Sequence, residues 1–187
     1  MRSRPVRSRL IEQTRRRATW GRKAESYSSL HHNEAMSELV LGTAQFGHAY
    51  GVTNSVGRIN DDALDDILDE AKRGGITRLD TAGVYGDALE RLRPWAHEFI
   101  YTSKIVGTDP ADPIEQIENG LTRLGRDSFE SCLIREWDAL EPAQQDRIFG
   151  RMLEARGQGL VERIGVAAYE QRDIESFADV AGVDVGG

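Results

Sequence analysis

The sequence contains a single cysteine and no long apolar run. Cys132 on its own cannot form an intrachain disulfide, and a cysteine-rich zinc site is excluded for the same reason. So little cysteine is typical of proteins in a reducing compartment, and we expect the chain to work in the cytoplasm. No apolar stretch approaches the roughly 18 to 20 residues that cross a bilayer, which argues against a membrane partner. The 187 residues are enough for one well-buried globular domain.

Basic residues are scarce beyond the first 36 positions. The net charge is -7, but residues 1–36 hold nine of the 24 lysines and arginines and only three of the 31 acidic residues. The other 15 basic and 28 acidic residues give the rest of the chain a net charge of -13. Nucleic acid is bound by neutralising its phosphates with a basic face, so we expect no nucleic-acid partner for this acidic body.

Residues 1–36 lack sustained apolar periodicity and are predicted to form a basic, disordered extension. They fit an organelle-targeting peptide, a nucleic-acid arm, or translated upstream sequence with Met36 as the natural start. We favour the third interpretation, because the first convincing strand begins directly after Met36. His31 and His32 fall within this extension and are interpreted as solvated linker, so no metal site is predicted.

Short apolar runs alternate with amphipathic stretches through residues 37–187, which is typical of βα units and a parallel sheet. One apolar stripe, at positions 63, 64, 67, 68 and 71, follows the helix-start signal Asn60. A second stripe, at positions 114, 117, 121 and 124, ends at Gly125. The predicted strands are 38–43, 76–80, 99–104, 131–135, 162–166 and 183–185.

Two α/β architectures fit this series: an open doubly wound sheet and a (β/α)8 TIM barrel. The first strand leads into Gly42, Gly47 and Gly51, whose spacing does not match the dinucleotide fingerprint of the open sheet. The barrel is therefore favoured. A complete barrel needs about 250 residues, so we predict an incomplete one, with about five βα units and the start of a sixth.

Four polar residues are predicted to meet at the carboxyl ends of the strands, where barrel enzymes have their active sites. Asp80, Lys104 and Arg135 end three successive strands, and Tyr85 follows Asp80 in the next loop. A lysine beside a tyrosine favours the phenolate and lowers the tyrosine pKa, while an aspartate pairs with the lysine. The chain has three lysines against 21 arginines, which makes Lys104 notable, although a strand-end lysine in plain solvent stays an alternative.

Five dispersed segments resemble the aldo/keto reductase family. They are "LGTAQFGHAYGVTN", "ITRLDTAGVYGD", "FIYTSKI", "GLTRLGRDSFESCLIR" and "RIGVAAYE", in the order and approximate spacing that this family shows. The resemblance implies a (β/α)8 barrel that binds NADPH and reduces a small carbonyl substrate, an aldehyde or ketone. It also implies that Asp80, Tyr85 and Lys104 are three of the four catalytic residues, with Tyr85 as the proton donor.

The same resemblance implies which residues lie at the nicotinamide end of the cofactor. Gly42 and Thr43 correspond to positions close to it, and Asp80 and Ala167 are also assigned there. Ala167 and Ala168 stand where many relatives have a serine and an asparagine, so no side chain can hydrogen-bond the carboxamide.

Arg135 stands where the family has its fourth catalytic residue, a histidine. As a fixed cation and donor, arginine could polarise a carbonyl oxygen, or it could form a strand-end salt bridge with Glu136. The chain also stops as the sixth strand begins, which leaves unpaired strand edges and predicts self-association. The alternative to a reductase is a non-catalytic remnant or binding module.

Overall fold

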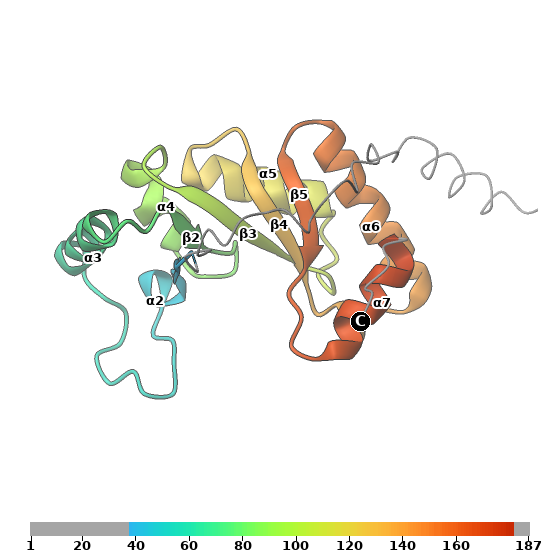
Figure 1. Cartoon of the computed structure of the whole chain (residues 1–187), viewed down its shortest axis with the longest axis horizontal. Helices are drawn as coiled ribbons and strands as arrows, with labels where there is room; N and C mark the ends of the chain where they lie inside the picture. The colour runs from blue at the N-terminus through green and yellow to red at the C-terminus, as the bar shows by residue number, and fades with distance from the viewer. Residues whose placement is uncertain (1–37, 182–187) are drawn as a thin grey trace, which may run out of the picture. The chain divides into compact units, whose positions relative to one another are not determined.

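The structure, a computed structural model, describes residues 38–181, in which five strands alternate with helices (Figure 1). The strands are β1 (Val40–Gly42), β2 (Arg78–Asp80), β3 (Ile100–Val106), β4 (Phe129–Arg135) and β5 (Val161–Val166). The helices are α2 (Ala44–Gly47), α3 (Asp61–Arg73), α4 (Ala88–Leu92), α5 (Pro113–Leu124), α6 (Pro142–Gly157) and α7 (Gln171–Ala181), with 3-10 turns η2 (Arg93–Trp95) and η3 (Trp137–Ala139). None of these helices combines the length and apolar character that a membrane crossing needs.

Five of the six predicted strands are confirmed. The predicted strand at 183–185 and the predicted extension at 1–36 lie outside the described residues, so the domain boundary at residue 37 stays a prediction. Strand β3 continues to Val106, two residues beyond its expected end, because Val106 pairs with Arg135 on β4.

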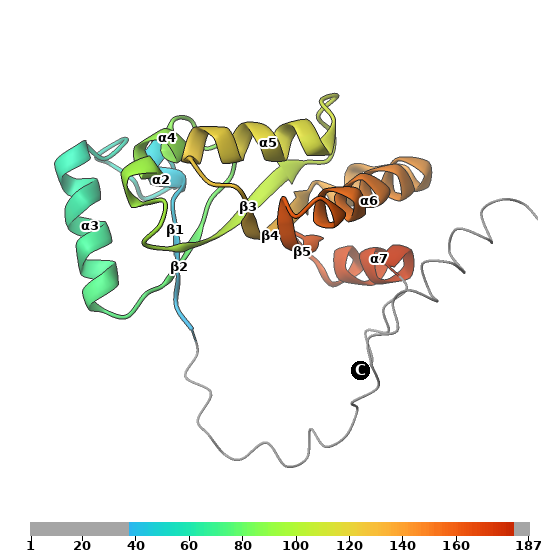
Figure 2. The ribbon, with the colours of Figure 1, turned by 90° about the horizontal axis from the view of Figure 1, so that it is seen from above.

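The five strands form one parallel sheet in the order β1-β2-β3-β4-β5. Each strand thus lies beside its successor in the chain. A doubly wound sheet reverses its order at a switch point, and no such reversal occurs among the described strands. Helices α3, α4, α5 and α6 lie in an arc on one side of the sheet (Figure 2). The predicted class, an incomplete (β/α)8 barrel, is confirmed.

The helix-covered face of the sheet forms the hydrophobic core. Successive strand residues point to opposite faces, so this face receives alternate residues of each strand. Its fully or almost fully buried apolar members on β2, β3 and β4 are Leu79, Tyr101, Ile105, Cys132 and Ile134, together with Phe129, whose ring lies against Gly120 of α5. Burying a large apolar side chain contributes roughly 1.5 to 3 kcal/mol, which makes this layer the main source of stability.

The helix boundaries follow the expected capping signals. The Asn60 side chain accepts a hydrogen bond from the Ala63 amide at 2.8 Å and caps α3, while Gly125 ends α5 with a φ of 77°. Within the predicted α3 stripe, Leu64, Leu68 and Ala71 are buried, whereas Ile67 lies at the margin of the buried face and is 37% exposed.

The opposite face of the sheet, which corresponds to the barrel interior, carries an ion-pair network at the amino end of the strands. Arg78 on β2 pairs with Glu38 at 2.8 Å and with Glu130 on β4. Glu130 also pairs with Arg163 on β5. The network joins β2, β4 and β5 across the face, at the end opposite to the predicted catalytic residues.

Candidate active site

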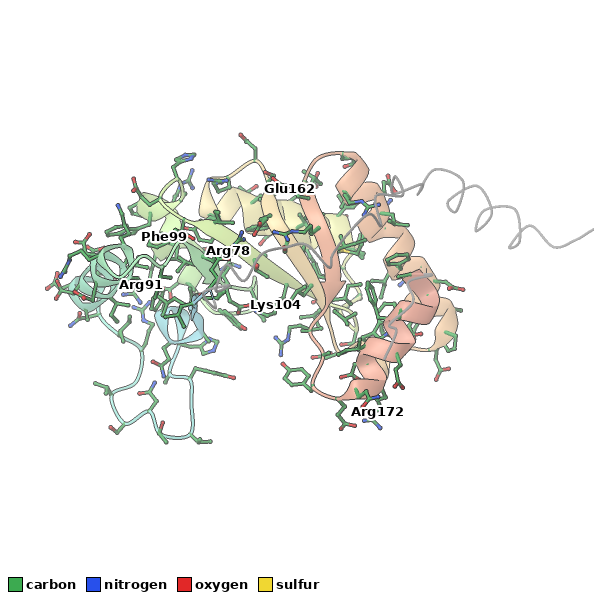
Figure 3. The ribbon with its side chains drawn as sticks, in the orientation of Figure 1. Arg78, Arg91, Phe99, Lys104, Glu162 and Arg172 are labelled. Carbon is green, nitrogen blue, oxygen red and sulfur yellow. The ribbon has the colours of Figure 1, made fainter. Side chains whose placement is uncertain are left out.

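Asp80 and Lys104 are in contact at the carboxyl ends of β2 and β3. Asp80 pairs with Thr102 in the sheet register, so Lys104, two residues farther along β3, projects from the same face. Lys104 is labelled in Figure 3. The Lys104 ammonium donates hydrogen bonds to the Asp80 carboxylate and, at 3.2 Å, to the Thr81 carbonyl oxygen. Its side chain is 10% exposed, against 33% for Asp80. A nearly buried cation needs such a counter-charge, so Asp80 holds Lys104 in the site.

Tyr85 completes a three-residue cluster with Asp80 and Lys104. The Lys104 ammonium donates to the Tyr85 hydroxyl oxygen at 3.4 Å, and Nζ lies 5.3 Å from the centre of the tyrosine ring. The turn that carries Tyr85 is closed by hydrogen bonds from the Tyr85 amide to the Ala82 carbonyl at 3.1 Å and from the Ala88 amide to the Tyr85 carbonyl at 3.0 Å. The structure therefore brings together three of the four predicted catalytic residues.

Arg135, the fourth predicted catalytic residue, ends β4 on the same face of the sheet. Lys104 pairs with Leu133, and Arg135 lies two residues farther along β4. No hydrogen bond or ion pair joins Arg135 to Asp80, Tyr85 or Lys104. The expected salt bridge with Glu136 does not form either; the Glu136 carboxylate instead accepts a hydrogen bond from the Thr108 hydroxyl. Within residues 38–181 the guanidinium has no acidic partner, which leaves its donors available for a ligand.

Thr43, predicted to lie close to the cofactor, holds the end of β1 to the end of β2. It is fully buried, and its amide and hydroxyl both donate to the Asp80 carbonyl oxygen, at 2.9 and 3.0 Å. Two hydrogen bonds from one residue restrain the backbone of Asp80. The Thr43 hydroxyl proton is thereby committed to the protein.

The residues present fit the nicotinamide end of NADPH on two observations. A Cβ placed on Gly42 would meet nothing within 4 Å, so there is open space on the inner face beside Asp80. Only one Asp80 carboxylate oxygen receives a donor from the described residues, which leaves the other able to accept from a hydroxyl group. Ala167 offers no polar side chain, and its amide already donates to the Ile134 carbonyl at 2.9 Å.

His48 is a neighbour of Tyr85 that the sequence reasoning missed. Its ring meets the Tyr85 ring edge-on, with centroids 6.2 Å apart and planes at 89°, and it also contacts Tyr50 at 6.0 Å. His48 directly follows α2, at the carboxyl end of β1. Its place after the first strand is the signal that could have found it, since all such loops gather at one rim of a barrel.

A cavity of about 350 Å³ opens beside Lys104, between the Tyr85 turn and α5. Its polar lining includes Asp109, Asn119 and Arg123, and Gly83 and Val84 close it on the side of the turn. The lysine of the cluster is thus accessible from this side.

The described residues thus combine a sequential parallel sheet, helices on one side of it, and an Asp-Lys-Tyr cluster at the carboxyl ends of its strands. The sequence model of the aldo/keto reductase family matches residues 38–185. The chain belongs to the aldo/keto reductase family, as the resemblance implied.

Individual relatives agree with this assignment. An aldo-keto reductase of Mycobacterium marinum is 27% identical over 133 residues, which cover 67% of this chain and 47% of the relative. The structure of the thermostable aldo-keto reductase Tm1743 is 25% identical with a TM-score of 0.60, covering 75% of this chain and 53% of that one. An aldo/keto reductase from Klebsiella pneumoniae, solved with NADP and acetate, shares the fold at 22% identity and a TM-score of 0.56, covering 73% and 48%. The chain thus spans about half the length of these relatives.

Proposed function

We propose that this protein reduces an aldehyde or ketone with NADPH, with Tyr85 as the proton donor. The observation that carries the proposal is the Lys104 ammonium, which contacts both the Asp80 carboxylate and the Tyr85 hydroxyl. Family membership supports the reaction class, and the NADP bound to the Klebsiella pneumoniae reductase supports the cofactor.

In this mechanism Tyr85 hydrogen-bonds the substrate carbonyl oxygen and transfers its phenolic proton to it. When bound, NADPH supplies the hydride that goes to the carbonyl carbon. The Lys104 ammonium stabilises the phenolate that remains, because a cation 3.4 Å from the oxygen offsets its negative charge. Asp80 keeps Lys104 oriented and partly neutralised. The active complex thus needs all three side chains on one face.

The cofactor contacts in the proposal come from Gly42, Thr43, Asp80 and Ala167. Gly42 would leave room for the nicotinamide ring, and the second Asp80 oxygen would be available to accept from a hydroxyl group of the cofactor. Thr43 acts through the backbone of Asp80, which it holds by two hydrogen bonds. Ala167 would contribute a small apolar side chain. The cytoplasm stays the predicted location, because the single cysteine of the chain cannot form an intrachain disulfide.

Arg135 has two roles open to it in a reductase: orienting the substrate carbonyl or polarising it. Its donors are unpaired within the described residues, so it can bind the substrate oxygen in place of the usual histidine. A guanidinium cannot supply a proton at neutral pH, which restricts Arg135 to orienting or polarising the carbonyl. An arginine in place of the family's histidine favours the second candidate function, a binding module without turnover.

Self-association through β1 and β5 is a further part of the proposal. Within residues 38–181, each of these strands pairs on one side only, which leaves backbone donors and acceptors exposed. Light scattering on a size-exclusion column should then give a mass above that of the 20.8 kDa monomer. A monomer at every concentration tested would contradict this part.

The reductase proposal is tested with purified full-length chain, NADPH and a reactive carbonyl probe such as 4-nitrobenzaldehyde. We expect a saturable change in NADPH fluorescence and carbonyl-dependent oxidation, both absent in a blank. Tyr85→Phe should lower turnover by about a hundredfold or more, the usual contribution of a positioned acid, and leave cofactor binding unchanged. No fluorescence change and no oxidation would overturn the proposal, whereas cofactor binding without oxidation would favour the binding module.

Tyr101 provides the matched control for this substitution. It lies on the helix-covered face of β3, is 2% exposed, and donates its hydroxyl to the Trp95 carbonyl at 3.0 Å. Burial raises the pKa of Tyr101 well above its ordinary value. Tyr101→Phe should lower the free energy of unfolding by about 1 kcal/mol through the lost hydrogen bond and leave turnover unchanged. Equal losses of turnover in both variants would remove Tyr85 from its role as the acid.

A further inference from the structure

Arg123, in the last turn of α5, contacts the turn that carries Tyr85. One terminal nitrogen of its guanidinium donates to the Gly83 carbonyl oxygen at 2.7 Å, and the other donates to the Gly86 carbonyl oxygen. These carbonyls lie two residues before and one residue after Tyr85. A single side chain from a different element thus holds both ends of the segment that presents the phenol.

Glu90 on α4 fixes the orientation of this guanidinium. The Arg123 Nε donates to Glu90 Oε1 at 2.6 Å, and a terminal nitrogen donates to Oε2 at 3.0 Å. The Arg123 guanidinium holds the pKa of the Glu90 carboxyl below its ordinary value. Glu90 is therefore charged at neutral pH, and the Arg123 side chain, 22% exposed, is held from both sides.

The turn depends on contacts with other segments, such as Arg123 and the backbone of Gly47, because its own residues give it little support. Gly83 and Gly86 have no side chains that could pack, and Gly86 adopts a φ of 56°. Glycine loses more conformational freedom on folding than any other residue, so a segment flanked by two glycines opens easily. The donors of a guanidinium lie on separate nitrogens and can bind two separated carbonyl oxygens at once, whereas the donors of a lysine share one nitrogen.

We propose that Arg123 is a positioning residue, which keeps the Tyr85 hydroxyl next to the Lys104 ammonium by binding the carbonyls of Gly83 and Gly86. The consequence for catalysis rests on the proposed function. The consequence for the backbone does not, because the hydrogen bonds of the turn can be measured without substrate. Arg123 touches neither of the reacting groups and acts only through the backbone of the turn.

The test is amide hydrogen exchange of the full-length chain, followed at the Tyr85 and Ala88 amides, which close the turn. In Arg123→Lys the loss of charge-assisted hydrogen bonds should speed exchange at these two amides by about tenfold or more. Glu90→Gln keeps the Arg123 guanidinium but weakens the contact that orients it, so exchange at the same two amides should speed up by a smaller factor, about threefold. The control is Arg151→Lys: Arg151 on α6 also makes a two-pronged ion pair, with Asp112, far along the chain from the turn. Arg151→Lys should leave the exchange rates of the Tyr85 and Ala88 amides unchanged.

Steady-state kinetics give the second readout. In Arg123→Lys we expect kcat to fall by about tenfold, with KM for the carbonyl and for NADPH within about twofold of the original values. A merely structural role would instead lower stability and active fraction without changing local exchange relative to the rest of the protein. Unchanged exchange at Tyr85 and Ala88 would overturn the inference whether or not the chain turns over. If exchange rises in a chain that shows no activity, the inference stands and the proposed function fails.

Discussion

Gly47 and Gly86 pack backbone against backbone, and this contact joins α2 to the Tyr85 turn. A Cβ on Gly47 would overlap the Tyr85 carbonyl oxygen, and one on Gly86 would overlap the Gly47 carbonyl. The two glycines are 39 positions apart in the printed sequence, in segments that follow β1 and β2. The tight approach therefore restrains the loop on which the phenol depends.

Gly47→Ala should destabilise the protein and displace Tyr85. The new methyl group meets backbone atoms, which cannot rotate away, so we expect a loss of about 2 kcal/mol in the free energy of unfolding and a fall in carbonyl turnover. Urea unfolding and NADPH oxidation measure the two effects. Gly150→Ala is the matched control, since a Cβ at Gly150 within α6 meets nothing within 4 Å. It should raise stability by about 0.5 to 1 kcal/mol. A Gly47 variant as stable as the original would contradict the close contact.

Arg135→His is expected to raise carbonyl turnover. A neutral imidazole can bind the substrate oxygen with less desolvation than a full guanidinium charge, and a saving of about 1.4 kcal/mol in the activation barrier corresponds to about tenfold in rate. Initial rates of NADPH oxidation at saturating carbonyl give the comparison. Arg147→His, at an exposed position on α6, should have no effect. A large decrease for Arg135→His would show instead that the guanidinium has been recruited to the site.

The hydrogen bonds of the Asp173 carboxylate lead to a prediction of how the stability of the protein changes in acid. Hydrogen bonds from the Glu170 and Tyr169 amides, at 3.0 and 2.8 Å, hold the pKa of the Asp173 carboxyl below its ordinary value of 3.8. The folded state therefore releases this proton more readily than the unfolded state. The stabilisation is fully present above the ordinary pKa and is lost as the pH falls through the lower, folded value.

Asp173→Asn should accordingly be less stable than the original protein at neutral pH, with the difference narrowing below the ordinary carboxyl pKa of 3.8. Urea unfolding over a pH series measures this. Asp138→Asn, an exposed partner of Arg172 at 3.7 Å, serves as the control and should change little, because exposed ion pairs contribute little. If the stability difference between Asp173→Asn and the original protein stayed constant as the pH fell, the charged carboxylate could not be its source.

Cys132 should be unreactive in the folded protein. It is completely buried on the helix-covered face of β4, and burial raises the pKa of its thiol to about 12, so almost none is present as the reactive thiolate at neutral pH. Ellman's reagent should label it only as the chain unfolds, with one equivalent in denaturant. Rapid labelling under native conditions would mean that β4 opens readily or is not covered by its helices.

The main part of the fold could be predicted because its signals are local. Apolar runs and helix caps are read from neighbouring residues, which is why β1 to β5, the Asn60 cap and the Gly125 end were all expected. The candidate site followed from one further rule, that parallel strands bring their carboxyl ends to one rim. Asp80, Tyr85 and Lys104 were found in this way, and they do meet.

The remaining features depend on contacts between distant segments. Nothing in the sequence around Arg123 indicates that its guanidinium holds two carbonyls about 40 positions away, as the structure shows. Glu136 accepts a hydrogen bond from Thr108 in another loop instead of pairing with Arg135, and no local pattern around either residue indicates this contact. The sequence by itself determined the five described strands, the helices α3 and α5 and the candidate catalytic side chains, because these follow from local patterning and from the order of the strands. Only the tertiary structure decided which of those side chains are held, by which partners, and which are left available, because packing joins residues that no local pattern connects.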